Sequence, residues 1–318
     1  MKAAIVTELG QTSPTYADFP MPTPMEGQHL IRVSAASISH VTKSRASGAH
    51  YSADGALPFV AGMDGVGVRE DGQRVYFLLP AHPYGAMAEL CVVDAEHCIV
   101  LPDDLDDCAA AAMAIPGMSS WAALMERAHL CPGETVLING ATGISGRLAV
   151  QIAKHLGAGK VIATGRHAAS LDALRSLGAD ATVALTQDKD ALQAALKHEF
   201  ALGVDVVLDY LWGESAQALI EAAARFGPDG VPVRYVQIGA ASGANITLPS
   251  AALRSSALQL MGSGMGSVPM PRLFAAIAGV LAAAPAAGFQ ITTQSMPLAQ
   301  LEQAWAMDDA RARMVLRP

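Results

Sequence analysis

The stretch Thr135-Val-Leu-Ile-Asn-Gly140-Ala-Thr-Gly143-Ile-Ser-Gly146 decides the fold of this chain. It starts as a short apolar run, passes through glycines at every third position and leads into a segment with apolar residues at helical spacing. Residues without a Cβ let the chain turn tightly, bring backbone N–H groups near a pyrophosphate and pack a helix against a strand. The helix N-terminus adds unpaired N–H donors and a positive dipole end. The stretch predicts a dinucleotide-binding turn; the alternative is a glycine turn in an α/β sheet that binds nothing.

The chain around this turn alternates between apolar runs and amphipathic segments. A helix with Leu148, Ile152 and Leu156 on one face ends at Gly157, and a second helix at 168–177 ends at Gly178. Strands are expected at 135–138, 160–164, 181–185, 204–208, 235–238 and 257–261. Such alternation builds a parallel sheet with helices on both faces, so we expect a doubly wound α/β domain over residues 114–265.

The residue after the second strand of this domain indicates which dinucleotide it binds. An NAD-binding fold usually carries an acidic residue about 20 positions beyond the glycines, where it binds the ribose hydroxyls. Arg166 stands 20 positions after Gly146, and no Asp or Glu is near it. A guanidinium there suits the 2′-phosphate of NADPH. The alternative is an ordinary solvated arginine on a loop.

The two ends of the chain differ from its middle. Residues 1–113 contain short apolar runs broken by Gly and Pro, which is typical of antiparallel strands. Residues 266–318 predict a helix near 271–284, a short run at 289–293, a helix near 298–307 and a last strand at 314–316. This tail is either an independent cap or a return to the first domain.

Composition excludes several classes of protein. Hydrophobic residues make up 52% of the 318 residues and charged residues 16%, which rules out general disorder. The net charge of −8 without a basic run argues against a nucleic-acid or anionic-membrane surface. The four cysteines form no CxxC pair, and the N-terminal residues lack the apolar stretch of a signal peptide. The alanine-rich stretch at 273–289 is too short and too weakly hydrophobic to be a membrane span. We therefore expect a soluble, cytoplasmic protein.

Several motifs together resemble the medium-chain dehydrogenase/reductase superfamily, in particular its zinc-free quinone oxidoreductase branch. The resemblance covers nearly the whole chain. It is carried by Ile31–Gly48, by Leu57-Pro-Phe-Val-Ala-Gly62-Met-Asp-Gly65-Val-Gly67, by Ala109–Leu124, by the turn in Gly133–Gly157, by Ser176-Leu-Gly-Ala-Asp180, and by the runs Val204–Asp209 and Arg234–Gly239.

This resemblance implies a fold and a set of site residues. It implies a GroES-like β-rich catalytic domain formed by residues 1–113 and 266–318, and a Rossmann cofactor domain formed by 114–265, with cofactor and substrate meeting in the cleft between them. It also implies a homodimer through the last Rossmann strand, near Ala257–Met261. The cofactor-binding residues are expected to be Gly140, Ala141, Thr142, Gly143, Ile144, Ser145, Gly146, Thr164, Gly165, Arg166 and Gly239.

Zinc-dependent members of the superfamily bind their catalytic metal through Cys, His–Glu and a third Cys or Asp. Here the first position is Ser39, the Gly-His-Glu motif becomes Gly62-Met63-Asp64, and the four-cysteine lobe is missing. A catalytic zinc site needs three protein ligands. We therefore expect no metal site, and chemistry that needs no Lewis acid; His40 and Asp64 binding a metal with further help is the alternative.

Three residues are candidates for a catalytic role. Related zinc-free enzymes often carry Asn-x-x-Asp in the cleft loop, where this chain has Ser39, His40, Val41 and Thr42. Zinc-free enoyl reductases can carry a tyrosine proton donor just after the glycine of this loop, and Tyr51 lies one position later than that. A phenol is protonated at neutral pH, as a donor must be. We take Ser39, His40 and Tyr51 as the catalytic candidates; a hydrogen-bonded structural histidine and a surface tyrosine are the alternatives.

The sequence thus predicts an NADPH-dependent reductase of quinones or α,β-unsaturated carbonyls, independent of zinc. Two alternatives stay open. One is an NADP(H)-dependent carbonyl or alcohol oxidoreductase. The other is a non-catalytic NADPH-binding redox sensor, because Ser39 and Thr42 both depart from the family pattern.

Overall fold

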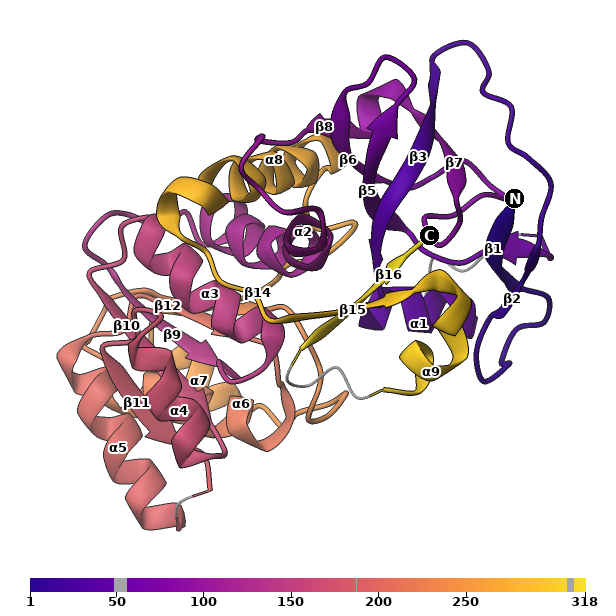
Figure 1. Ribbon diagram of the computed structural model, residues 1–318. Helices are drawn as coiled ribbons and strands as arrows, with labels where there is room; N and C mark the ends of the chain where they lie inside the picture. Colours follow the sequence, from indigo (N-terminus) through magenta and orange to yellow (C-terminus); the bar gives the residue numbers. More distant parts are fainter. Residues whose placement is uncertain (49–55, 187, 308–311) are drawn as a thin grey trace. The chain divides into compact units, whose positions relative to one another are not determined.

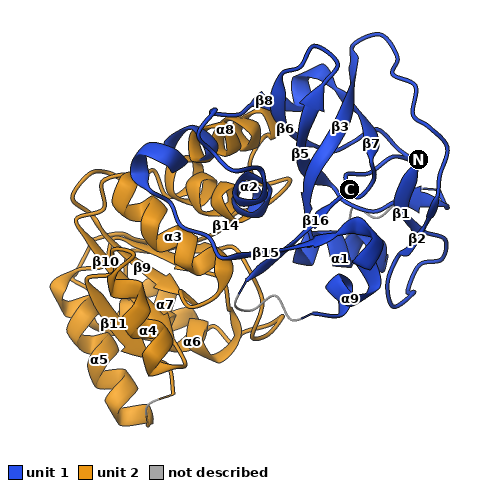
Figure 2. Cartoon of the chain, viewed as in Figure 1, with its two compact units in different colours: residues 1–115, 281–318 blue, residues 116–280 orange. Residues whose placement is uncertain are grey.

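The computed structural model describes residues 1–48, 56–186, 188–307 and 312–318, in two compact units (Figure 2). Unit 1 comprises Met1–Ile115 and Leu281–Pro318, and unit 2 comprises Pro116–Val280. The breaks at 115/116 and 280/281 fall inside two long helices. The domain boundaries expected from sequence, at 113/114 and 265/266, stay a prediction.

Unit 2 is built on a six-stranded parallel sheet in the order β11-β10-β9-β12-β13-β14 (Figure 1). Its strands are β9 (Thr135–Asn139), β10 (Lys160–Gly165), β11 (Ala181–Ala184), β12 (Val206–Asp209), β13 (Val233–Gln237) and β14 (Leu258–Gly262). The chain moves outward from β9 in one direction, then crosses back to β12 and continues in the other. This reversal between β9 and β12 is the strand order of a doubly wound sheet, so the predicted fold class is confirmed.

Helices connect these strands and bury both faces of the sheet. They are α3 (Ile144–His155), α4 (Ala168–Arg175), α5 (Lys189–Leu202), α6 (Gly213–Phe226) and α7 (Ser250–Arg254). Leu196 and Phe200 of α5 and Leu219 of α6 pack with Leu137 of β9 in one cluster. Side chains alternate along a strand, so Val136 and Ile138 face the opposite side, where α3 contacts β9.

Unit 1 is rich in antiparallel strands. Its larger sheet has the order β15-β16-β3-β5-β6-β8, with β7 also pairing with β3, and a smaller sheet has the order β2-β1-β4. The bounds are β1 Lys2–Val6, β2 Thr15–Asp18, β3 Gln28–Ser37, β4 Phe59–Val60, β5 Asp64–Arg69, β6 Arg74–Leu78, β7 Leu90–Asp94, β8 Cys98–Val100, β15 Thr293–Pro297 and β16 Arg313–Arg317. The helices are α1 (His40–Ala46), α9 (Leu301–Ala306) and the short η1 (Ala95–His97) and η3 (Leu298–Gln300).

The C-terminal tail returns to the first unit and does not form an independent cap. Strand β16 pairs with β3, with Leu316 opposite Ala36, and Trp305 of α9 joins the core cluster of this unit. The short run at 289–293 overlaps a strand only at its last residue, because β15 begins at Thr293. The shift follows from pairing, because β15 lies in register with β16 from Thr293 to Pro297.

Two long helices cross the boundary between the units. Helix α2 (Asp107–Ala122) continues into a π-helical turn, η2 (Ala123–Arg127), and α8 spans Met270–Ala287. Within the described residues, 107–127 and 270–287 are long and apolar enough to cross a membrane, so the expectation that the alanine-rich stretch is too short and too weakly hydrophobic is wrong. In the most apolar 18-residue windows of the two helices, 61% and 33% of the residues are buried inside the protein. Core helices of soluble proteins meet the same length and composition test.

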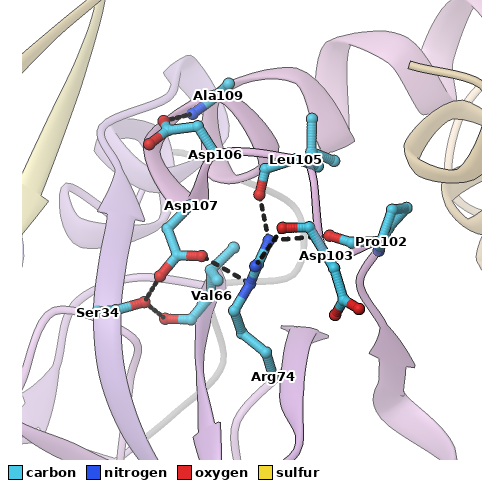
Figure 3. Close-up of polar contacts among 9 residues, drawn as sticks. All are labelled: Ser34, Val66, Arg74, Pro102, Asp103, Leu105, Asp106, Asp107 and Ala109. Atoms are coloured by element: carbon cyan, nitrogen blue, oxygen red, sulfur yellow. Dashed lines mark hydrogen bonds and ion pairs between the residues drawn. The ribbon is translucent and has the colours of Figure 1, made fainter. Parts of the chain in front are cut away.

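Hydrogen bonds and an ion pair join the start of α2 to the sheet of unit 1 (Figure 3). Asp107 accepts a 2.6 Å hydrogen bond from the Ser34 hydroxyl and lies 3.0 Å from the Arg74 guanidinium. Arg74 also donates to the carbonyls of Pro102, Asp103 and Leu105. Asp106 accepts from the Ala109 N–H at 2.9 Å. Asp106 and Asp107 of the acidic run at 103–107 therefore stabilise the N-terminus of α2.

Candidate cofactor-binding and catalytic sites

The three glycines of the turn between β9 and α3 meet different steric demands. Gly140 has φ +86°, and a Cβ there would lie 2.8 Å from the Leu211 side chain. A Cβ on Gly146 would lie 2.4 Å from the Gly140 carbonyl oxygen. A Cβ on Gly143 would meet only the Gly140 oxygen, at 3.8 Å. Gly140 and Gly146 are therefore required by the fold, while Gly143 is exposed and leaves space for a ligand.

The N-terminus of α3 is open toward that space. Gly143 is its N-cap, in an extended conformation, and makes no side-chain cap. The first N–H groups of a helix have no partner within the helix, so those of Ile144, Ser145 and Gly146 can bind an anion. Ala141 is fully buried, whereas Thr142, Ile144 and Ser145 are half-buried. The turn therefore presents partly exposed side chains together with the first backbone donors of α3.

The end of β10 lies directly beside the turn. Thr164 is fully buried, and its hydroxyl accepts from the Gly140 N–H at 3.2 Å. A Cβ on Gly165 would lie 2.5 Å from the Thr142 side chain, which is too close. A glycine at this position therefore lets Thr142 pack against the end of β10. Arg166 follows and is exposed. Within the described part of the chain, its guanidinium makes no ion pair.

A buried polar network, which the sequence patterns did not predict, lies beneath the turn. Asn139 and Asp209 end neighbouring strands β9 and β12 in register, and both are fully buried. The Asn139 side-chain amide donates to Asp209 at 2.8 Å, and its oxygen accepts from the Thr164 hydroxyl at 2.8 Å. Asp209 also accepts from the Tyr235 hydroxyl at 2.8 Å. A polar residue closing each buried apolar run was the signal available in the sequence.

Gly239 lies on the loop after β13 and contacts the loop after β12. Its N–H donates to the Asp209 carbonyl at 3.1 Å. A Cβ at this position would lie 2.7 Å from the Tyr210 carbonyl oxygen. A glycine there lets the two loops pack together at the carboxyl edge of the sheet. The predicted cofactor residues of unit 2 are thus gathered at this one edge.

Two of the catalytic candidates, Ser39 and His40, lie at the start of α1. Ser39 is its N-cap and accepts from the Thr42 N–H at 3.1 Å, and the two hydroxyls are 2.9 Å apart. Both side chains are buried, while His40 is exposed. The cap accounts for Ser39 and Thr42 structurally. Tyr51 lies outside the described residues, so its role stays a prediction.

A buried carboxyl lies at the start of β5, in the segment that resembles the family's glycine-rich strand. Asp64 is fully buried, accepts from the Tyr76 hydroxyl at 3.1 Å and has a second oxygen without a hydrogen-bond partner. Burial raises the pKa of Asp64 from 3.8 to about 7, partly offset by the Tyr76 hydrogen bond and the charge of Arg313. Arg313 itself donates to the Ile38 carbonyl at 3.2 Å, one residue before the cap of α1.

Metal ligands do not gather in the part of the chain that the structure describes. No three His, Cys, Asp or Glu side chains there are close enough to hold an ion. Met63, in the position of the zinc-binding histidine, is buried. Independence from zinc stays a prediction.

Comparison with known proteins gives the relatives of this chain. The zinc-binding dehydrogenase family matches residues 146–296. A probable NADPH-dependent quinone reductase from Emericella nidulans is 30% identical over 100% of both chains. A 2-methylene-furan-3-one reductase from Solanum lycopersicum is 30% identical over 59% of this chain and 53% of its own. Among solved structures, the quinone oxidoreductase from Thermus thermophilus, also studied in complex with NADPH, is 28% identical with a TM-score of 0.83 over 100% of both chains.

The buried carboxyl of Asp64 predicts a pH-dependent stability. Between pH 4 and 7 the folded protein keeps a proton that the unfolded chain has released, so this group lowers stability as the pH rises. Asp64→Asn removes the effect. The free energy of unfolding of Asp64→Asn, relative to that of wild type, should therefore increase between pH 4 and 7. Above pH 7 the increase should reach at most about 4 kcal/mol.

Urea denaturation of wild type and Asp64→Asn at pH 5 and pH 8 measures this difference. Asp104→Asn, which changes an exposed carboxyl, serves as the control and should show no such trend. A difference between wild type and Asp64→Asn that is the same at both pH values would contradict the raised pKa.

Proposed function

Because the chain belongs to the medium-chain dehydrogenase/reductase superfamily, in its quinone oxidoreductase-like branch, we propose that it reduces quinones or α,β-unsaturated carbonyls without zinc. It is an NADPH-dependent oxidoreductase. The observation that carries the proposal is the uncapped N-terminus of α3 behind the open Gly143, in a chain that matches a probable quinone reductase over its whole length.

The residues of unit 2 fit NADPH. The N–H groups of Ile144 and Ser145 suit the pyrophosphate, since Gly143 leaves that side open. The exposed guanidinium of Arg166, unpaired among the described residues, suits the 2′-phosphate. NADPH, when bound, supplies the hydride. The protein's own contribution is to orient the two reactants and to exclude water.

The proton that completes the reduction needs a donor. His40 is exposed at the start of α1, and Tyr51 is a phenol. Ser39 has a hydroxyl already shared with Thr42, which makes it the weaker donor of the three. A quinol oxyanion can take its proton from water, whereas a reduced enone needs one delivered to carbon. We therefore assign the proton donor to His40 or Tyr51 for enones.

Zinc independence is part of the proposal. Ser39 and Met63 stand where the superfamily carries metal ligands. A thioether is a soft, weak ligand compared with the imidazole or thiolate that zinc prefers. Without a Lewis acid, an already polarised conjugated carbonyl is the substrate that hydride transfer can reduce.

We also propose that the protein is a cytoplasmic homodimer. Strand β14 is at the edge of the parallel sheet, and its backbone is unpaired on one side in the described chain. Pairing of β14 with its copy in a second chain would remove this exposed edge.

The direct test of the function is turnover. Purified protein mixed with NADPH and a panel of quinones and enones should consume NADPH, followed by its absorbance. Metal analysis should find well under one zinc per chain, and chelators should leave the rate unchanged. NADPH binding without turnover of any substrate would favour a redox sensor. Turnover confined to simple carbonyls or alcohols would favour the other alternative, and stoichiometric zinc would contradict the metal-free proposal.

Two glycine substitutions separate ligand contact from folding. Gly143→Val adds atoms where only the Gly140 oxygen lies within 4 Å, so the fold should survive while NADPH affinity falls by more than about tenfold. Gly146→Val forces a Cβ against backbone, and we expect it to lower the free energy of unfolding by about 1–3 kcal/mol or more. Calorimetric binding and urea denaturation check the pair. Unchanged NADPH affinity in Gly143→Val would mean that the turn is only structural.

Arg166 should decide the choice of cofactor. A charge-assisted contact to the 2′-phosphate is worth about 1.5–3 kcal/mol, so NADPH should bind roughly 10- to 100-fold tighter than NADH. Arg166→Ala should remove most of this margin and leave NADH binding nearly unchanged. Arg254→Ala, at an exposed arginine of the same unit, is the control. Equal weakening of both cofactors by Arg166→Ala would contradict the assignment, as would equal affinity of wild type for both.

A further inference from the structure

The turn that follows β12 is strained, and Asp209 holds it in place. Trp212 has φ +58°, an uncommon conformation for a bulky residue, and Gly213 after it has φ +62°. One oxygen of the buried Asp209 carboxylate accepts from the N–H groups of Leu211 and Trp212, at 2.9 and 3.1 Å. These bonds, made by a charged acceptor to backbone donors, offset the strain at Trp212.

The same carboxylate is fixed from two sides by neighbouring strands. The Asn139 amide donates to the oxygen that holds the turn, and the Tyr235 hydroxyl donates to the other oxygen. Burial, with the charge of Asp209, raises the pKa of Tyr235 well above its ordinary value, so this hydroxyl keeps its proton. Four donors thus converge on the Asp209 carboxylate, two from the turn and two from neighbouring strands, and they hold the group against the turn.

The turn held by Asp209 lies against the glycine turn. The Leu211 side chain contacts Gly140 so closely that a Cβ on Gly140 would lie 2.8 Å from it. The carbonyl of Leu211 accepts from the Ser242 N–H at 2.8 Å, which joins the loop after β13 to the same arrangement. A movement of residues 211 and 212 would therefore change the surface beside the cofactor turn.

The strand order says which half of a dinucleotide meets this surface. A doubly wound sheet consists of two mononucleotide-binding halves, and the ligand crosses the crevice where the strand order reverses. Here the reversal lies between β9 and β12. The half with β9–β11 carries the glycine turn and Arg166, which suit the adenosine side. The half with β12–β14, including residues 211 and 212, is left for the nicotinamide side.

We infer that Asp209 is a positioning residue for the nicotinamide half of NADPH: it holds the strained Leu211–Trp212 turn against Gly140, and so shapes the wall on that side of the crevice. This inference rests on the proposed NADPH binding described above. It assigns to Asp209 an effect on one half of the cofactor, which a general contribution to stability would not produce.

Binding of whole and half cofactors tests the inference. NADP⁺ and adenosine 2′,5′-bisphosphate, which lacks the nicotinamide half, are titrated calorimetrically into wild type and Asp209→Ala. The variant should bind NADP⁺ about tenfold or more weakly, yet bind the bisphosphate within about twofold of wild type. Asp209→Asn should recover most of the loss, because its amide oxygen can still accept from Leu211 and Trp212 and the Tyr235 hydroxyl can reverse to accept from its amide nitrogen.

Asp205 supplies a matched control. It lies next to the opposite, amino end of β12, and its carboxylate accepts from the Thr135 N–H at 2.8 Å. Asp205→Ala also removes a carboxylate that accepts a backbone hydrogen bond, so it should lower stability while leaving both ligands bound as in wild type. If Asp209→Ala does not fold, Asp209→Glu carries the same test, because it keeps the charge but moves the carboxylate by one methylene.

The outcomes are distinct. Equal weakening of NADP⁺ and the bisphosphate by the Asp209 variants would overturn the positioning role, as would unchanged binding of both by a folded Asp209→Ala. Loss of NADP⁺ binding in Asp205→Ala to the same extent would show that only stability matters. If wild type binds neither ligand, the proposed function fails first, and the inference fails with it.

Discussion

The close approach of α3 to the end of β9 is the constraint on which the cofactor unit depends. A Cβ on Gly146 would lie 2.4 Å from the Gly140 carbonyl oxygen, so no other residue type fits there without moving backbone. In the same turn, Gly143 provides no side-chain cap, so the first N–H groups of the helix have no partner within the helix. The packing demand and the anion-binding capacity therefore lie in one short turn and rest on different glycines of it.

Buried polar groups at the carboxyl edge of the sheet have a second effect. Asn139, Thr164, Asp209 and Tyr235 are fully buried and bonded to one another, so the strands end in a fixed pattern and the loops leave in fixed directions. Such a network is costly unless every member is satisfied. Its cost is offset here because it also satisfies the backbone N–H groups of Gly140, Leu211 and Trp212, which the strained loops would otherwise leave unpaired.

Unit 1 shows how the departures from the family pattern are accommodated. Ser39 and Thr42 replace the polar pair that related enzymes carry, and they satisfy each other as a helix cap. Asp64 is buried with one oxygen unpartnered, and its burial raises the pKa of this carboxyl to about 7 despite the opposing hydrogen bond from Tyr76.

The sequence by itself determined the alternating strands and helices of unit 2, because apolar periodicity and helix-ending glycines are local signals. It also determined the glycine turn and the place of Arg166, since both depend on spacing along the chain. Tertiary structure alone decided that the C-terminal tail pairs with β3, that β15 begins at Thr293, and that Asn139 and Asp209 meet. Those features depend on register between strands far apart in sequence, and register is set by the packing of whole faces and not by local propensity.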